Sequence, residues 1–340
     1  MNGFNPDELI EQYMSLQSGE PRMRAIRAAI VEAERAQDDA AAMQFHHDLI
    51  HESVFSGDRY QALIDFPQFL AIQHRNPELE AEWTHDRLWM FKWIVEAATE
   101  FYQIEKKQIL QWFSEFRRDL LKNGYSLRSW YEKRAIFYQY ADRAKMRMDY
   151  AAFLEAPKDS MSDGEASELD SEVRFEMQID NRERAMKAAN EIFEKRYRTE
   201  EVPCKTYFYL LEDACKRGDA EAAADYAKRL KPLCDGQRFQ LEPIGLMLCW
   251  YAQRDPAAGL DFYLRNKSLR DGSRNPFLCF WFDRGASKLL HAAADAGLSM
   301  NEQTPEQMHA QADAMDAACK EIAAKFDARN GYDYFMRSLD

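Results

Sequence analysis

A six-residue turn occurs twice in this chain, and it constrains the fold more than any other sequence feature. The first copy is residues 57–62 (GDRYQA) and the second is residues 218–223 (GDAEAA). Each copy separates two segments whose apolar residues have helical spacing. Glycine accepts the left-handed conformation that ends a helix, aspartate caps the next helix, and alanine lets that helix lie close to the first. The turn therefore predicts closely packed pairs of amphipathic helices.

Helical periodicity continues along most of the chain. The 340 residues include only 13 glycines and 11 prolines, and 46% are apolar, which suits long helices around a large core better than many short strands. The sequence predicts an all-α protein with roughly 14 or more helices and no sheet.

The helix pairs recur at a regular distance. The position equivalent to the small residue of the turn falls at Ala62, Ile109, Met146, Ala185, Ala223 and Gly259. The intervals are 47, 37, 39, 38 and 36 residues, in the range of solenoids built from helix pairs. Ile109 and Met146 are not small, so we expect their helices to lie further apart. The alternative is an irregular bundle whose helices happen to have similar lengths.

With this turn and this period the chain resembles the tetratricopeptide repeat (TPR) superfamily, although its period exceeds the usual ~34 residues. The resemblance implies a right-handed superhelical array (an α-solenoid) of antiparallel helix pairs. Residues 157–163 with 202–207, and residues 326–331, also resemble bacterial tetratricopeptide-like proteins whose function is not established. Those relatives carry a Cys-x-x-Cys where this chain has Gly164 and Ser167. The resemblance thus implies a fold and a binding role, and no thiol or metal chemistry in that loop.

One polar stretch interrupts the helical pattern, at residues 156–164 (APKDSMSDG). Proline, glycine and clustered polar residues mark a loop. We expect helical-pair repeats over residues 1–155, a loop over residues 156–168 and further helical-pair repeats over residues 169–340. Together they should form one continuous solenoid.

The net charge of −13 argues against binding to nucleic acid or to an anionic membrane, and it favours a basic peptide as partner. No stretch of ~20 apolar residues is present, and the N-terminus lacks the pattern of a signal peptide. The six cysteines form no Cys-x-x-Cys motif, so we expect reduced, buried thiols rather than disulfides. The expected compartment is the cytoplasm.

Motifs for catalysis or metal binding are sparse. His47 and His51 share a helical face and could hold a metal. They do not form the HExxH motif of metalloproteases, because Glu52 follows the second histidine rather than the first, and no third ligand is fixed by the sequence. A polar groove wall is the preferred interpretation. The chain has no Gly-rich phosphate loop, no GxSxG motif and no recognisable Cys–His arrangement. We therefore expect no enzymatic activity, no cofactor and no metal.

In a helical-pair solenoid the first helix of each pair lines a concave surface. Counted from the repeat position, the expected peptide- or protein-binding residues are Gln44, His47, His51, Arg128, Tyr131, Tyr138, Arg174, Lys205, Phe208 and Glu212. This polar and aromatic lining suits an extended peptide. At the same offsets Leu241, Ile244 and Leu248 are apolar, so either packing fills the groove there or the repeat frame is shifted.

Two further features concern aromatic residues. Aromatic runs such as residues 250–251 and 277–282 should be mostly core, with some side chains left as binding anchors. The string 326–331 (FDARNG) predicts the end of the last helix, with Gly331 in the left-handed position after it. Tyr332, Tyr334 and Phe335 should then fold back onto the final helices.

The function that follows is a non-catalytic scaffold or adaptor, which binds another protein or an extended peptide in its concave groove. The alternative is an intracellular peptide-sensing regulator that changes conformation on binding a small signalling peptide. A basic recognition helix near the N-terminus would favour the sensor, and the first ~60 residues contain none. We expect neither nucleic acid nor membrane as partner, and the sequence does not fix the oligomeric state.

Overall fold

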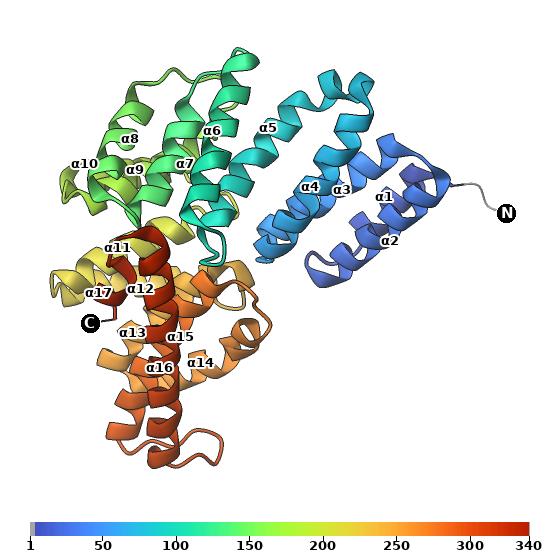
Figure 1. The fold of residues 1–340 in the computed structure, drawn as a ribbon. Helices are drawn as coiled ribbons and strands as arrows, with labels where there is room; N and C mark the ends of the chain where they lie inside the picture. Colours follow the sequence, from blue (N-terminus) through green and yellow to red (C-terminus); the bar gives the residue numbers. More distant parts are fainter. Residues whose placement is uncertain (1–3, 340) are drawn as a thin grey trace. The chain divides into compact units, whose positions relative to one another are not determined.

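The computed structural model describes residues 4–339, which fold into α-helices joined by short connections (Figure 1). These residues form seventeen α-helices and one short 3-10 helix. They contain no strand, only an isolated bridge between Met300 and Gln303. The all-α prediction is confirmed. Among the described residues, none of the helices combines the length and apolar character that crossing a membrane requires.

The described chain divides into two compact units. Unit 1 comprises residues 4–133 and 156–161, and unit 2 comprises residues 134–155 and 162–339. The division runs within α7 (Arg128–Gln139), whereas the sequence suggested the polar loop as the boundary. That loop is residues 156–164, because α9 already begins at Glu165.

Unit 1 contains six whole helices and the first half of α7. The six are α1 (Pro6–Met14), α2 (Glu20–Ala36), α3 (Asp39–Phe55), α4 (Arg59–Arg75), α5 (Pro77–Thr99) and α6 (Lys106–Lys122). From α1 to α6 each helix packs against the next, and α3 also contacts α5.

The segment 156–161 is anchored in unit 1. The carboxylate of Asp159 accepts hydrogen bonds from the backbone N–H groups of Ser126 at 2.6 Å and Met161 at 2.9 Å. The side chain of Lys92 on α5 is fully buried, and its Nζ lies 3.0 Å from the carbonyl oxygen of Met161. The same ammonium lies 3.2 Å from the ring centre of Trp89. These contacts explain why a loop between two helices of unit 2 belongs to unit 1.

Unit 2 contains the rest of α7 and the remaining elements. They are α8 (Arg143–Glu155), α9 (Glu165–Gln178), α10 (Arg182–Glu194), α11 (Cys204–Lys216), α12 (Ala220–Cys234), η1 (Arg238–Gln240), α13 (Leu241–Arg254), α14 (Pro256–Asp271), α15 (Pro276–Asp295), α16 (Pro305–Asn330) and α17 (Tyr334–Arg337). Helices α9, α11, α13 and α15 contact one another in succession, and each also packs against the helix that follows it. This neighbour-to-neighbour packing is consistent with an α-solenoid.

The repeated turn has the predicted backbone, but only one copy caps its helix. Gly57 and Gly218 have positive φ values of 82° and 68°. The side chain of Asp219 accepts a hydrogen bond from the backbone N–H of Ala222 at 3.1 Å, whereas Asp58 makes no such cap on α4. The cap prediction is therefore correct for the second copy and wrong for the first.

The C-terminal segment folds back as predicted. Helix α16 is followed by Gly331 at a φ of 68°. The carboxylate of Asp327 accepts hydrogen bonds from the backbone N–H groups of Phe335 and Met336 at 2.9 and 2.8 Å. Phe335 is only 1% exposed, and its ring stacks on Phe326 with 4.5 Å between centroids. These contacts fix the tail onto the end of unit 2.

Helices α13 and α15 touch through their backbones. A Cβ atom added to Gly285 would lie 2.0 Å from the carbonyl oxygen of Gly245. One added to Gly245 would lie 2.1 Å from the carbonyl oxygen of Trp281. Only glycine allows this approach, which fixes the relative position of the two helices.

Candidate functional site

Unit 2 contains a groove of about 580 Å³, within the range typical of ligand-binding sites. Side chains of α7, α8, α9, α11, α13 and α15 and of the C-terminal segment line it. We call it the unit 2 groove, and its lining residues are Gln139, Arg143, Met146, Gln178, Glu212, Cys215, Lys216, Leu246, Cys249, Trp250, Gln253, Trp281, Arg284, Lys288, Tyr332, Tyr334, Arg337 and Ser338.

A smaller recess of about 30 Å³ adjoins the groove. The two cavities share several walls, among them Gln139, Glu212 and Trp281. The recess adds Tyr140, Arg174, Phe208, Tyr209 and Glu242. The side chains around both cavities are thus mixed aromatic, amide and charged, which fits a site that orients a ligand through a few polar groups.

Two tryptophans give the groove apolar surface. Trp250 on α13 and Trp281 on α15 both line it. The indole N–H of each is buried and makes no hydrogen bond within residues 4–339. An unsatisfied buried donor costs about 1–3 kcal/mol, so both indoles would be stabilised by an acceptor.

Basic side chains outnumber acidic ones in the groove lining, although the chain as a whole is acidic. Five basic side chains line the groove, against the single carboxylate of Glu212. Three of the five form ion pairs: Lys216 with Glu212 at 3.1 Å, Arg143 with Asp180 at 3.3 Å and Arg337 with Asp333 at 2.6 Å. Arg284 forms no ion pair with a described carboxylate; it donates a hydrogen bond to the carbonyl oxygen of Ser338. Its guanidinium lies 5.8 Å from the ring centre of Trp281. The groove therefore offers cationic and aromatic groups side by side, in a chain with a net charge of −13.

Arg174 and Tyr140, which line the recess, and Lys205 at its edge each form hydrogen bonds or ion pairs with neighbouring side chains. Arg174 donates from Nε to the amide oxygen of Gln139 at 2.7 Å and from a terminal nitrogen to the hydroxyl of Tyr140 at 3.2 Å. Burial raises the pKa of Tyr140 well above its ordinary value, so this tyrosine stays neutral. Burial disfavours the charged form of Lys205, but the adjacent Glu242 carboxylate outweighs this and raises the pKa of Lys205. Lys205 therefore stays charged beside Glu242, at the edge of the recess.

Five of the predicted binding residues lie in unit 2. Arg174 and Phe208 line the recess, and Glu212 lines both cavities. Lys205 lies at the edge of the recess, where it forms an ion pair with Glu242 at 2.5 Å. Tyr138 is only 4% exposed and lines neither cavity; the guanidinium of Arg134 lies 5.2 Å from its ring centre.

Three of the predicted residues lie on α3 in unit 1. Gln44 and His47 both hydrogen-bond to Asp48, at 2.9 and 3.0 Å. Burial would raise the pKa of Asp48, but hydrogen bonds from His47, Tyr13 and Gln44 outweigh it and lower the pKa. The ring of His51 packs against Phe55 and Trp93, at 4.8 and 5.6 Å between centroids.

The other two predicted residues of unit 1 lie on α7. Arg128 is buried and donates a hydrogen bond to the carbonyl oxygen of Ala156 at 2.8 Å, so it helps to hold the segment 156–161. Tyr131 is half-buried, and its ring lies edge-on to Trp130 at 5.0 Å.

Several groove residues were not predicted from the sequence. Leu241, Ile244 and Leu248 have no exposed surface, so packing fills the predicted positions on α13. The groove side of α13 is formed instead by residues such as Cys249 and Trp250. Because α13 lies in close contact with α15, the face of α13 that was expected to line the groove is buried in the core instead. The aromatic runs at residues 250–251 and 277–282 were the only sequence signal for the two tryptophans.

All six cysteines are free thiols. Cys249 lines the groove, and burial raises the pKa of its thiol. Thiols with a raised pKa are poor nucleophiles, so Cys249 supplies apolar surface rather than reactivity.

Comparisons with known proteins add no relative: no protein-family model matches the chain, and no curated protein matches its sequence.

Proposed function

We propose that this protein is a non-catalytic scaffold or adaptor of the tetratricopeptide-like kind, whose unit 2 groove binds an extended acidic segment of another protein. The proposed architecture is a right-handed array of antiparallel helix pairs. The observation that carries the proposal is the excess of cations beside two tryptophans in a groove of about 580 Å³. The proposed setting is the cytoplasm, which the six free thiols support.

The lining of the groove matches the needs of an extended peptide. Gln139, Gln178 and Gln253 carry amide groups that can both donate to and accept from a peptide backbone. Trp250 and Trp281 offer large apolar surfaces of the kind enriched among binding anchors. The basic residues of the groove favour a peptide in which acidic side chains alternate with the apolar side chains that contact the tryptophans.

The charge of the groove reverses the expectation drawn from the whole chain. A net charge of −13 suggested a basic partner. Charges act mainly over about 10 Å at ordinary ionic strength, so the local lining governs a ligand in the groove.

The test is a binding measurement with two fluorescent twelve-residue peptides, one alternating Glu with Leu and Phe, the other with Lys in place of Glu. Fluorescence anisotropy should detect binding of the acidic peptide to the native chain, and weaker binding as salt rises from 50 to 500 mM, because ion pairs at an accessible groove are screened. The double variant Arg143→Gln, Lys288→Gln should lose roughly two- to thirtyfold in affinity. Each lost charge pair at such a rim is worth up to ~1 kcal/mol.

The matched control is Lys267→Gln on the exposed face of α14, outside the groove. It removes a charge of the same sign and should leave affinity unchanged. Equal binding of both peptides, or equal losses in the control and in the groove variant, would contradict the proposal.

The second candidate function is a peptide-sensing regulator. The observation that favours it is the contribution of the C-terminal segment, including Tyr332, Tyr334 and Arg337, to the groove wall. A ligand that contacts this segment could move it. Hydrogen–deuterium exchange of residues 332–339 with and without the acidic peptide separates the two functions: increased exchange on binding supports the sensor, and equal or decreased exchange supports the scaffold.

A further inference from the structure

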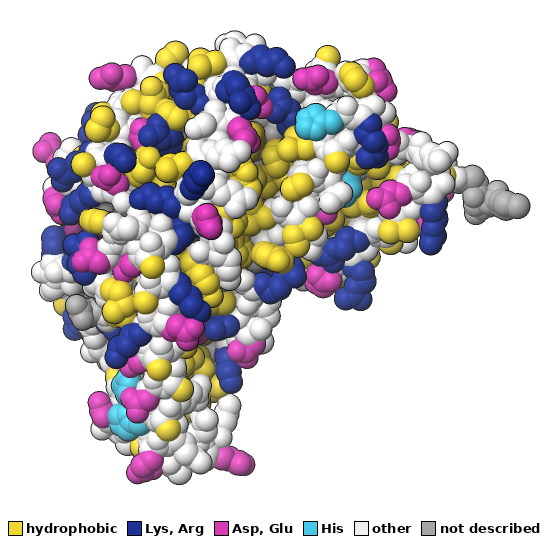
Figure 2. All heavy atoms as spheres, viewed as in Figure 1, with side chains coloured by type: hydrophobic (Ala, Val, Ile, Leu, Met, Phe, Trp, Pro, Cys, Tyr) yellow, Lys and Arg dark blue, Asp and Glu magenta, His cyan; other side chains and the backbone are white. Residues whose placement is uncertain are grey.

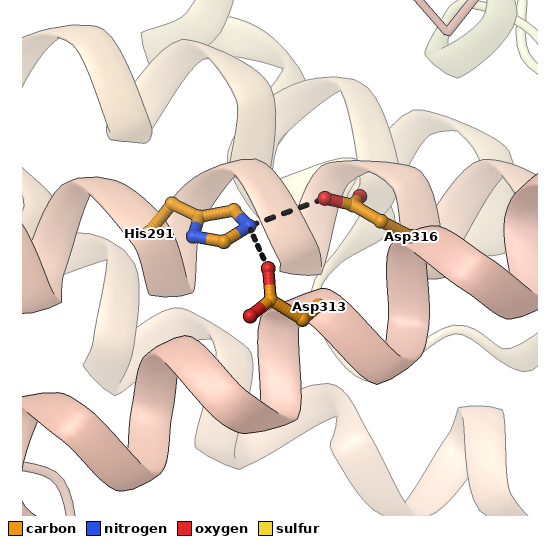
Figure 3. A group of neighbouring side chains, drawn as sticks. All are labelled: His291, Asp313 and Asp316. Atoms are coloured by element: carbon orange, nitrogen blue, oxygen red, sulfur yellow. Dashed lines mark hydrogen bonds and ion pairs between the residues drawn. The ribbon is translucent and has the colours of Figure 1, made fainter.

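We propose that His291, Asp313 and Asp316 form a binding site for a divalent transition-metal ion, Zn²⁺ in the first instance. The site lies outside the unit 2 groove. Nε2 of His291 lies 3.1 Å from Oδ2 of Asp316 and 3.8 Å from Oδ1 of Asp313 (Figure 3). One possible ligand atom from each side chain lies within 4.8 Å of the other two.

The three side chains converge because two long helices pack side by side. His291 projects from α15, and Asp313 and Asp316 lie three residues apart on α16. The two helices are joined by core residues that are fully buried, including Leu290 and Ala312. Ligands on rigid helices keep their geometry better than ligands on loops.

The site is accessible from solvent. His291 is about one-third exposed and Asp316 two-fifths exposed, whereas Asp313 is three-quarters exposed. Figure 2 shows histidine and acidic side chains together on the surface at the lower end, where Figure 1 draws the ends of α15 and α16. An ion can therefore enter directly, and its remaining coordination position is open to water.

The spacing and the donors suit zinc. Zn²⁺ binds imidazole nitrogen and carboxylate oxygen at about 2.0–2.2 Å, so a tetrahedral site places ligand atoms roughly 3.3 Å apart. The observed separations of 3.1 and 3.8 Å lie on either side of this value, and small side-chain rotations would equalise them. An imidazole ligand favours Zn²⁺ over Mg²⁺ or Ca²⁺, which prefer oxygen donors alone.

A second histidine orients the first. Nδ1 of His309 lies 3.0 Å from Nδ1 of His291, so one of these nitrogens must donate a hydrogen bond and the other accept it. Nε2 of His309 lies 3.2 Å from Oδ1 of Asp295. If His309 donates to Asp295 through Nε2, its Nδ1 accepts from His291. That arrangement leaves the lone pair of His291 Nε2 facing Asp313 and Asp316.

A lone pair facing two carboxylates is repulsive unless a cation lies between them. The cation is either a proton on His291 or a metal ion. A hydrogen-bonded partner on the far nitrogen is the arrangement found for most metal-ligating histidines, because it fixes the tautomer and the direction of the ring. His309 and Asp295 fill this role, as positioning residues that do not touch the ion.

The experiment is isothermal titration of the full-length, chelator-treated and dialysed chain with ZnCl₂ at pH 7.5. We expect one high-affinity ion per chain with a Kd of about 10 μM or tighter, and Co²⁺ should give the visible absorption of a tetrahedral site. Asp316→Asn and His291→Gln should each weaken binding by at least about tenfold, and His309→Gln by ~10- to 100-fold. Because protons compete for the ligands, the affinity should also fall at pH 5.5.

The matched control is His85→Gln. His85 is a half-exposed histidine beside a single carboxylate, with 3.6 Å between Nδ1 and Oδ1 of Asp86. This variant should bind zinc as tightly as the native chain. Helical content measured by circular dichroism identifies any variant that fails to fold. Asp313 is the most exposed of the three ligands, so Asp313→Asn is the variant least able to disturb folding, and it should weaken binding at least about fivefold. No binding to the native chain below about 100 μM Zn²⁺, or undiminished binding by all three ligand variants, would overturn the proposal.

Discussion

Replacing Gly285 by alanine tests the backbone contact between α13 and α15. The new Cβ would lie 2.0 Å from the carbonyl oxygen of Gly245 and 2.8 Å from its carbonyl carbon, whereas ordinary contact begins at 3.4 Å. The helices would have to separate by about 1.4 Å, the difference between 3.4 and 2.0 Å. Gaps of only ~0.5–1 Å already forfeit a quarter to a half of the dispersion energy of the atoms that line them.

The cost should therefore reach the upper end of the ~1–3 kcal/mol seen for overpacked cores. Alanine in place of glycine inside a helix is otherwise favourable by about 1 kcal/mol. The net expectation is that the free energy of unfolding falls by about 2 kcal/mol, whereas helix propensity alone would raise it. Urea unfolding followed by far-ultraviolet circular dichroism measures it.

Gly272→Ala is the matched control for the Gly285 substitution. Gly272 follows α14 with a φ of −83°, and the nearest atom to an added Cβ is the carbonyl oxygen of Ser268 at 3.5 Å. This substitution should change stability by less than ~0.5 kcal/mol. If Gly285→Ala were as stable as the native chain, α13 and α15 could not be in the close contact described, and this contact would not fix their relative position.

Three further results are expected. Asp170→Asn should stabilise the chain at pH 8 and have little effect at pH 4, because burial raises the pKa of Asp170 to about 7 in the folded chain. The bound proton stabilises the folded chain fully below the unfolded pKa near 4, and this stabilisation is lost as pH rises through 7. The urea midpoints of the variant and the native chain at the two pH values check this. Asp219→Ala should lower the free energy of unfolding by ~1 kcal/mol because it removes the N-cap of α12, whereas Asp58→Ala removes no cap from α4. Hydrogen exchange at the first turns of α12 and α4 measures this, and equal increases in exchange in the two variants would contradict it. Phe335→Ala should cost about 3 kcal/mol and release the tail, measured by urea unfolding and by faster exchange at residues 332–339; unchanged exchange would mean that Phe335 does not hold it.

The helices and turns could be predicted from the sequence because their causes are local. Glycine with positive φ, aspartate before a helix and helical spacing of apolar residues all act within a few positions. The end of α16 and the return of Phe335 follow from Gly331 and the aromatic residues after it. Asp58 is the exception, since a residue well suited to capping makes no cap on α4.

The groove could be predicted only in part because it depends on how helices rotate about their axes. Of the expected binding residues, Arg174 and Phe208 line the recess and Glu212 lines both cavities. On α13 the contact through Gly245 sets the rotation, and no periodicity within α13 encodes a contact with α15. The excess of basic side chains in the groove was hidden for a similar reason, because residues far apart in sequence contribute it.

The cluster of His291, Asp313 and Asp316 could not be predicted from the sequence. His291 and His309 are 18 residues apart on different helices, so no short motif joins them. His47 and His51, the pair considered as possible metal ligands, share one helix and were expected to form a polar groove wall instead. In the structure His47 contacts Asp48 and the ring of His51 packs against Phe55.

The segment 156–161 places the last contacts of unit 1 behind part of unit 2 in the order of protein synthesis. A ribosome releases residues 134–155, which belong to unit 2, before it releases the segment that completes unit 1. Until Met161 has emerged, the carbonyl oxygen that accepts from the buried Lys92 is not available, and Asp159 cannot accept from Ser126. Domains usually fold one after another as they leave the ribosome. Here the contacts of Lys92 and Ser126 with residues 159–161 can form only after residues 134–155 of unit 2 have left the ribosome.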